Sequence, residues 1–525
     1  MSLLATLRRQ LKTSLSTRLL IPLVVFLLCL GYIYHSPLRL GQTASYPPTT
    51  DFDTKPAYDT HTLTLPPLDP VYAPTFPDLH LPSVFDTPLL RPLAARLHDL
   101  LSRPGLDLAE ANAANKRHCP VEIGDSISDL RGEIPFWESL TKEDIAERRA
   151  GVVKWLEGMV ESGQEVVANG QSLQGRGIVM TGGNQDTTER LITALRHLRR
   201  LNVRLPVEVF HFPGELQDGN QRREIEEFGA TIREIVGLDK KQGVWKNFEI
   251  KGPALIQSSF REVLYLDSDN VPLRDPTHLF DAPLYTDHGR AVFWPDISKD
   301  HPSNAIWRVV GKPCSYRSWT FESGQMIIDK AGNRGLNLAA LLIAQEMQRE
   351  GHDFWFHFCS GDKDTFRWAF EMLDLEYEES PRWMSLLGTF NPFDNNRFCG
   401  HTVLQYDLVI PDGHERQLPL FAHSNLLKHT GTLGLHRGNL FTHVKRMSDD
   451  SAHLQTLNHA NQYVYEGPQR GLCTDLEWTS TVDQVPPEER ERVRIETIPV
   501  EEIEGNVFAG FEDVWFDEGG RIGGW

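Results

Sequence analysis

The sequence lacks several features that mark common classes of protein. It has no Asn-x-Ser/Thr tripeptide, so it offers no acceptor for N-linked glycosylation. Its 6 cysteines form no closely spaced Cys or Cys/His cluster, which argues against a structural zinc site. Cations are outnumbered, with 53 Lys and Arg against 72 Asp and Glu and a formal net charge of -19. We therefore expect no nucleic-acid partner, although a metal ion can still reverse the field of one cleft for a small phosphorylated ligand.

One stretch of the chain is apolar enough to meet a membrane. Residues 1–18 carry basic but no acidic side chains, and an apolar run from Leu19 to Tyr34 follows. This run is shorter than the roughly 20 residues that span an average bilayer, but thinner membranes of the early secretory pathway accept shorter spans. We expect a signal anchor with a cytosolic N-terminus and a lumenal remainder; a cleaved signal peptide is the alternative. Only Cys29 lies in this run, so the other cysteines, odd in number, can form at most two bridges in an oxidising lumen.

Proline is spread unevenly along the chain. From Ser36 to about Pro104 prolines recur every few residues with little helical or strand periodicity, which is typical of a semi-rigid stem. After about Gly467 the pattern weakens again into charged, proline-containing sequence. The expected segments are a cytosolic tail 1–18, a transmembrane anchor 19–35, a stem 36–110, a helical lead-in 111–176, a globular domain 177–466 and a C-terminal extension 467–525.

The middle of the chain alternates between strand and helix patterns. Apolar residues follow helical spacing from Thr141, a suitable N-cap, to about Ala168. Strand-like and helical segments then alternate. Strands are expected at 177–183, 207–212 and 231–235, and helices at 187–201 and 222–226. This alternation predicts an α/β fold with a mainly parallel, twisted sheet flanked by helices.

Two carboxylates follow an apolar strand in the segment Leu264-Tyr265-Leu266-Asp267-Ser268-Asp269. Strand alternation puts Asp267 and Asp269 on the same side. Carboxylate oxygens at the carboxyl end of a buried strand can hold Mn²⁺ or Mg²⁺, while diphosphate oxygens take other positions on the ion. The similar pair Asp51 and Asp53 lies in the proline-rich stem, and we assign it to solvent. We therefore predict a metal site at Asp267 and Asp269, with Ser268 beside the ligand.

Several separated motifs accompany this pair of carboxylates. They are Gly177 to Gly183, Lys251 to Leu255, Tyr265 to Asp269, Glu322-Ser323-Gly324-Gln325, Gly361 to Phe366 and His423 to Lys428. The region that they cover, about 176–430, resembles sugar-nucleotide transferases of the GT-A fold. More narrowly, it resembles the fungal Golgi α-mannosyltransferase family, which adds mannose to cell-wall mannoprotein glycans. The resemblance implies a catalytic GT-A domain, a sugar-nucleotide donor and a divalent cation.

The resemblance also implies which residues hold the donor. The loop after the first strand touches the nucleotide in such folds, although a double glycine is by itself only a turn signal. That loop contains Thr181, Gly182 and Gly183. Lys251 would offset phosphate charge, where the alternative is a surface lysine. Lys428, or His429 beside it, would contact the diphosphate. His423 would complete the metal site, where the alternative is a core histidine that only forms hydrogen bonds.

Two further motifs point to the sugar. The cluster around Glu322 precedes an apolar strand, and Glu322 would bind sugar hydroxyls or lie behind the anomeric carbon; a capping or turn role is the alternative. Asp362 and Asp364 precede a helical segment, and the resemblance makes Asp362 the sugar-contacting residue and Asp364 the helix cap. The many tryptophans and phenylalanines of this half are expected to be mostly core, with one or two stacking on sugar rings.

These expectations combine into one function. We expect a type II Golgi membrane enzyme that transfers mannose from GDP-mannose to mannose residues of a protein-linked glycan, with Mn²⁺, or Mg²⁺ in its place, as cofactor. The resemblance implies an α linkage formed with retention. The choice between α-1,2 and α-1,3 stays open, with α-1,2 favoured, and we expect association with other Golgi enzymes. Whether retention uses a carboxylate nucleophile or same-face attack stays open. The alternatives are a UDP-sugar-dependent transferase and a non-catalytic lumenal glycan-binding or scaffold protein.

Overall fold

The structure is a computed structural model that describes residues 81–115, 130–169, 173–244, 246–301, 303–314, 319–429, 434–448, 458–465, 471–478 and 495–523. The expected tail, anchor and most of the stem lie outside these residues. Within them, no helix is both long enough and apolar enough to cross a membrane.

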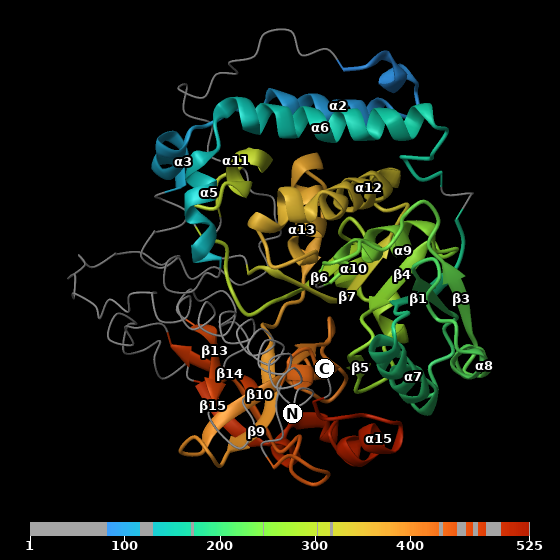
Figure 1. Ribbon diagram of the computed structural model, residues 1–525, viewed down its shortest axis with the longest axis vertical. Helices are drawn as coiled ribbons and strands as arrows, with labels where there is room; N and C mark the ends of the chain where they lie inside the picture. The colour runs from blue at the N-terminus through green and yellow to red at the C-terminus, as the bar shows by residue number, and fades with distance from the viewer. Residues whose placement is uncertain are drawn as a thin grey trace, which may run out of the picture. The chain divides into compact units, whose positions relative to one another are not determined.

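A seven-stranded sheet in the order β3-β2-β1-β4-β7-β6-β8 forms the centre of this region (Figure 1). Its strands are β1 Arg176–Thr181, β2 Val207–His211, β3 Ala230–Glu234, β4 Glu262–Leu266, β6 Ala291–Pro295, β7 Phe321–Asp329 and β8 Glu378–Glu379. The strands β1 to β4 are parallel, and β7 runs antiparallel to both β4 and β6. The predicted α/β fold with a largely parallel sheet is thus confirmed. Parallel strands end at one edge, so the segments after β1 and β4 meet there.

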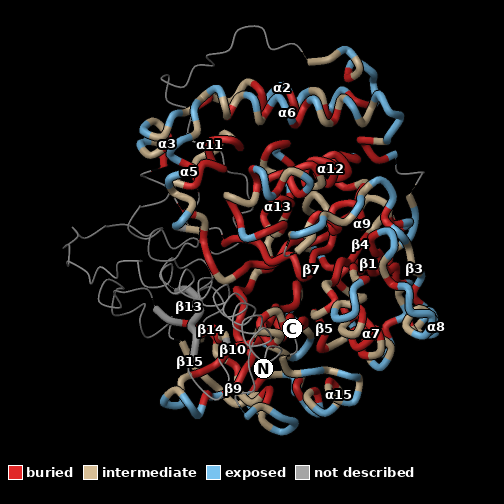
Figure 2. The backbone as a smooth tube through the Cα atoms, viewed as in Figure 1, coloured by how far each residue is buried: buried red, intermediate tan, exposed pale blue. Residues whose placement is uncertain are grey.

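Helices cover both faces of this sheet. Successive side chains of a strand point to opposite faces, and on β1 Ile178 packs in the core that includes α7, whereas Val179 packs in the core that includes α12. Figure 2 shows β1, β4 and β7 in the buried interior and α8 largely exposed. The helices of this region are α7 Gln185–Arg200, α8 Gly219–Glu227, α9 Lys251–Gln257, α10 Pro283–Thr286, α11 Ile306–Val310, α12 Leu336–Arg349 and α13 Lys363–Leu373.

A further group of N-terminal helices packs on this region, with α2 and α6 over α12 and α13 (Figure 1). The helices of this group are α2 Arg91–Ser102, α3 Leu108–Asn115, α5 Ile134–Ser139 and α6 Lys142–Glu161. The expected N-cap is confirmed, because the Thr141 side chain and Asp144 form a reciprocal capping box at the start of α6. The stem boundary at 110 is wrong: Leu93, Leu97 and Leu100 of α2 are fully buried in the core. Their spacing of four and three residues is helical, and the nearby prolines obscured it.

A second, antiparallel sheet packs beside the first. Its strands are β5 Asn270–Pro272, β9 Ser385–Asn391, β10 Arg397–Tyr406, β11 Pro419–His423, β12 His443–Met447, β13 Asn458–Tyr465, β14 Gly471–Trp478 and β15 Ile495–Pro499. The strands run in the order β13-β14-β10-β9-β12-β15, with β11 paired to β10 and to β5. Because β5 directly follows the loop after β4, this loop links the two sheets.

The expected boundary at residue 467 is not a boundary of the structure. The strand β15 pairs with β12, and a disulfide joins Cys399 of β10 to Cys473 of β14. The helix α15 (Phe511–Asp517) buries Phe511 and Trp515 in the core beneath the second sheet. Strand pairing recruits residues that lack strong hydrophobic periodicity, which is why the sequence pattern alone missed it. Cys314 is also disulfide-bonded, and Cys359 is free and buried.

Candidate active site

Asp267 and Asp269 lie at the carboxyl end of β4, as the sequence predicts. The strand ends there because the backbone turns: Asp267 N–H donates to Gly324 O at 2.9 Å, and Asn270 N–H donates to Asp267 O at 3.0 Å. Asp269 O then accepts from Ser424 N–H at 2.9 Å. The loop is therefore held between β7 and the end of β11.

The second sheet delivers His423 to the same place. In the antiparallel pair of β5 and β11, Asn270 lies opposite His423. This register leaves the imidazole Nε2 3.1 Å from Asp269 Oδ1 and 3.9 Å from Asp267 Oδ2. One ligand atom from each of these three residues lies within 4.8 Å of the others. The three residues predicted to bind the metal are thus brought together, and their binding of a cation stays a prediction.

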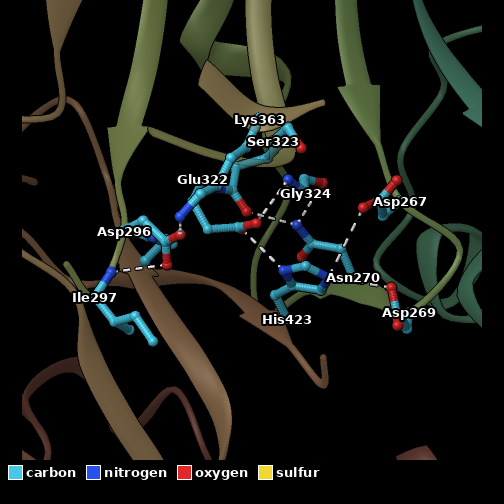
Figure 3. A network of polar contacts seen from close by, with 12 residues as sticks. Asp267, Asp269, Asn270, Asp296, Ile297, Glu322, Ser323, Gly324, Lys363 and His423 are labelled. Carbon is cyan, nitrogen blue, oxygen red and sulfur yellow. Dashed lines mark hydrogen bonds and ion pairs between the residues drawn. The ribbon is translucent and has the colours of Figure 1, made fainter. Parts of the chain in front are cut away.

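Glu322 holds the other side of the imidazole (Figure 3). His423 Nδ1 lies 2.8 Å from Glu322 Oε2, and Gly324 N–H donates to Glu322 Oε1 at 3.0 Å. Burial disfavours a charged imidazole, but the charges of Glu322 and Asp269 outweigh burial and raise the pKa of His423 to about 10. Glu322 lies inside β7, so the alternative role as a cap is wrong. A carboxylate behind a histidine is the arrangement that orients metal-ligating imidazoles.

Lys251 lies between Asp267 and Asp362. Its Nζ donates to Asp267 Oδ2 at 3.0 Å and lies 3.2 Å from Asp362 Oδ2. It also donates to Ser323 Oγ at 2.9 Å. Burial opposes the ammonium charge, but Asp267 and Asp362 raise the pKa of Lys251 above its ordinary value. The surface-lysine alternative is wrong, because only 8% of the residue is exposed.

Further cations surround Asp269. Lys428 Nζ donates to Asp269 Oδ2 at 2.8 Å. Burial alone would raise the pKa of Asp269, but Lys428 and His423 hold it well below its ordinary value. Sequence reasoning missed Arg190 of α7, which lines a pocket together with Asp269, and Lys246, whose pKa burial and the charge of Lys428 lower to about 8. Neither residue stands in a motif. Such a ring of positive charge is suited to a diphosphate.

Asp362 and Asp364, at the start of α13, are only partly as expected. Asp362 is buried and accepts from Ser323 Oγ at 2.9 Å, beside Lys251. Asp364 is not the cap of α13: its Oδ1 accepts from Phe321 N–H at 2.9 Å and pairs with Arg367, which ties α13 to β7. Sequence reasoning also missed Asp296, which follows β6 and pairs with Lys363 at 2.6 Å. A carboxylate directly after a strand was the available signal, as for Asp267.

The predicted nucleotide loop lies at the end of β1. Thr181 Oγ1 hydrogen-bonds to Tyr265 OH at 2.7 Å, and Tyr265 OH donates to Asp267 Oδ1 at 2.8 Å, so Thr181 connects to the metal carboxylates. Gly182 and Gly183 pack against neighbouring side chains. A Cβ on Gly182 would lie 3.2 Å from Leu191, and a Cβ on Gly183 would lie 2.3 Å from Glu215 Oε2. Neither glycine lines the pocket that contains Ser268 and Asp269. Their contact with a nucleotide stays a prediction.

Most aromatic side chains of this half are core, as expected. Those almost fully buried include Trp294, Trp319, Trp355, Trp368 and Trp383. Trp319 stacks on Trp383 with 4.2 Å between ring centroids, next to Asp296, whose backbone carbonyl accepts from Trp383 Nε1. The stacked rings and this hydrogen bond fix the backbone at Asp296.

The donor set fits a divalent cation. The carboxylates of Asp267 and Asp269 come from the loop after β4, and the imidazole of His423 comes from β11. Mn²⁺ accepts both the oxygen and the nitrogen ligands, and Mg²⁺ would take the oxygens. Asp267 is the most accessible of the three, with 21% of its side chain exposed, so the site opens to solvent on that side. A diphosphate can therefore reach an ion held there.

Known proteins match the region that carries Asp267, Asp269 and Lys251. Residues 175–317 and 315–407 match the family model described as "Mannosyltransferase putative". Alpha-1,2-mannosyltransferase MNN24 of Candida albicans is 27% identical over 346 residues, 56% of this chain and 47% of that protein. Alpha-1,2-mannosyltransferase MNN2 of Saccharomyces cerevisiae is 24% identical over 307 residues, 50% of each chain. The chain thus spans about half the length of these relatives.

Solved structures resemble the chain only distantly. Galactosyltransferase LgtC, in complex with donor and acceptor sugar analogs, is 14% identical and covers 39% of this chain and 72% of its own, with a TM-score of 0.27. Core-mannan synthase A from Aspergillus fumigatus, in a Mn/GDP form, is 10% identical over the same shares, with a TM-score of 0.26. Likeness at this level supports nothing about activity. The family match over residues 175–407 and the mannosyltransferase relatives support a relationship of this region to a fungal mannosyltransferase family.

Proposed function

We propose that this chain is a GT-A glycosyltransferase that moves mannose from GDP-mannose to a mannose hydroxyl of a protein-linked glycan, in a Mn²⁺-dependent reaction. The observation that carries the proposal is the triad Asp267, Asp269 and His423, surrounded by lysines, in a chain that matches a mannosyltransferase family model over residues 175–407. The α-1,2 linkage is proposed over α-1,3 because the matched relatives bear that name. An α bond formed with retention follows from the resemblance of the motifs.

The residues around the triad suit the departure of a diphosphate. A divalent cation bound by Asp267, Asp269 and His423 would neutralise the leaving group. Lys428 lies against Asp269 and Lys251 against Asp267, so both ammonium groups stand where negative charge develops. Glu322 keeps His423 oriented through Nδ1, which leaves Nε2 facing the carboxylates.

The sugar would lie on the other side of Lys251. Asp362 and Asp296 are buried carboxylates at this edge of the sheet, each paired with a lysine. Burial raises the pKa of both carboxyl groups despite these lysines, and their oxygens can accept hydrogen bonds from sugar hydroxyls. We assign the transferred mannose to Asp362 and Glu322, and the acceptor mannose to Asp296.

We further propose that the chain acts in the Golgi lumen, anchored by residues 19–35 and associated with other Golgi enzymes. The support is the apolar run with its basic flank, together with the disulfide between Cys399 and Cys473. Disulfides persist in secretory compartments and are rare in the cytosol.

A donor and acceptor assay tests the proposed activity. The purified full chain is incubated with Mn²⁺, a defined α-mannoside and either GDP-mannose or UDP-sugars, and the product linkage is determined. We expect a new α-1,2-mannose bond from GDP-mannose only, and loss of turnover in Asp269→Ala. Turnover with UDP-sugars alone would contradict the donor assignment. Equal activity of Asp269→Ala would contradict the metal site.

A further inference from the structure

A pocket is lined by Asp269 but not by Glu322 or His423. Its lining includes Ser268 and Asp269 of the loop after β4, Lys428 of the segment after β11, and Glu189 and Arg190 of α7. Trp515 of α15 and, after this helix, Gly519, Gly520, Arg521 and Gly523 also line it. A segment that the sequence pattern treats as an extension thus reaches the metal-binding carboxylate.

Residues 519–523 are docked at three points around this pocket. Arg521 Nη1 lies 2.5 Å from Glu189 Oε2 on α7, and Gly523 N–H donates to Leu427 O at 3.3 Å, next to Lys428. Gly520 packs on the Trp515 ring so closely that a Cβ there would lie 2.2 Å from it. The segment therefore connects α7 to the loop that carries Lys428.

The sugar and the nucleoside of a donor bound at Asp269 would lie in different parts of the site. Asp269 contacts His423, and His423 in turn contacts Glu322, which the proposed function assigns to the transferred sugar. Asp269 also lines the pocket, whereas His423 and Glu322 do not. A diphosphate bound at Asp269 would therefore direct its sugar toward Glu322 and its nucleoside into the pocket. Glycine backbone on one wall permits close approach of a flat or bulky ligand group.

We propose that residues 519–523 form one wall of the subsite for the nucleoside of a nucleoside diphosphate. Arg521, held by Glu189, closes the edge of this subsite. The inference rests on the proposed function and adds a role for a segment that carries none of the recognised motifs.

The test compares GDP with inorganic pyrophosphate, which shares the phosphates but has no nucleoside. Binding of each to the full chain with Mn²⁺ is measured by calorimetry for wild type, for a chain ending at Glu518 and for Arg521→Ala. We expect the shortened chain to lose about tenfold or more in GDP affinity, with pyrophosphate affinity kept within about twofold, and Arg521→Ala to lose less. Arg200→Gln, which breaks a surface pair with Glu518 outside the pocket lining, is the matched control and should bind both ligands as wild type does.

Several outcomes would overturn the inference. It is wrong if the shortened chain and Arg521→Ala keep the wild-type ratio of GDP to pyrophosphate affinity, whether both affinities stay unchanged or fall together. If wild type binds GDP no better than pyrophosphate, no nucleoside subsite exists. If wild type binds neither ligand with Mn²⁺, the proposed function fails as well, so the two failures are distinguishable. Thermal unfolding of each variant separates loss of binding from loss of fold.

Discussion

Asn270 of β5 lies directly opposite His423 of β11, and this single register joins the two sheets at the candidate metal site. Asn270 follows Asp269 in the chain, so pairing it with His423 brings an imidazole from a distant segment next to both carboxylates. Asn270 Nδ2 also donates to Gly324 O at 2.8 Å, which fixes the same loop to β7. The metal site therefore depends on strand pairing as much as on its ligands.

Replacing Gly324 by alanine should weaken metal binding. A Cβ at this position would lie 2.4 Å from His423 Nδ1, so the imidazole or Glu322 must move. Disturbing the groups behind a metal-ligating histidine costs about 10–100-fold in metal affinity. Mn²⁺ titration followed by calorimetry measures the effect. Gly151→Ala, where a Cβ meets nothing within 4 Å, is the control and should bind Mn²⁺ normally; equal affinities in the two variants would contradict the prediction.

Metal affinity should rise with pH. The pKa of His423 is raised to about 10, so the imidazole is protonated at neutral pH and must lose its proton to bind a cation. Each pH unit between 7 and 9 should then strengthen Mn²⁺ binding by up to about tenfold, with release of close to one proton. Calorimetry in buffers of different ionisation enthalpy counts this proton. His423→Gln should bind weakly and with little pH dependence; an unchanged pH profile would show that another group titrates.

Lys251→Met should slow turnover more than it weakens donor binding. Its ammonium lies between Asp267 and Asp362, so its removal leaves the half-buried Asp267 and the buried Asp362 without this positive charge. Loss of one preorganised electrostatic group lowers kcat about 10²–10³-fold. Steady-state rates with GDP-mannose give kcat and KM separately. Lys142→Met, which removes an exposed partner of Glu110, should change neither constant; a change in KM alone for Lys251→Met would make Lys251 a binding residue only.

Removing the disulfide should destabilise the second sheet. Cys399 and Cys473 are 74 residues apart, and chain entropy predicts that closing such a loop stabilises the fold by about 4 kcal/mol. The double variant Cys399→Ser with Cys473→Ser should therefore unfold at lower temperature and lower denaturant concentration. Cys359→Ser is the control, because Cys359 is free and its hydroxyl replacement can still donate to Gly361 O. An unfolding midpoint of the double variant equal to that of the control would show that the second sheet is stable without the bridge.

The sequence determined the strands β1 to β4 and the position of the first carboxylates, because both are local. Alternating apolar residues form a strand wherever they can be buried, and Asp267 and Asp269 follow β4 directly. Motif resemblance added Lys251, His423 and Lys428, all of which the structure brings to the same edge.

Tertiary structure alone decided the rest. Arg190 and Lys246 join the site because segments far apart in the chain pack together, and no local pattern encodes that approach. The role of Asp364 and the place of residues 519–523 were also set by distant partners, Phe321 and Glu189. Local patterns record what a segment can bury, whereas hydrogen bonds and ion pairs across the fold decide which polar groups meet.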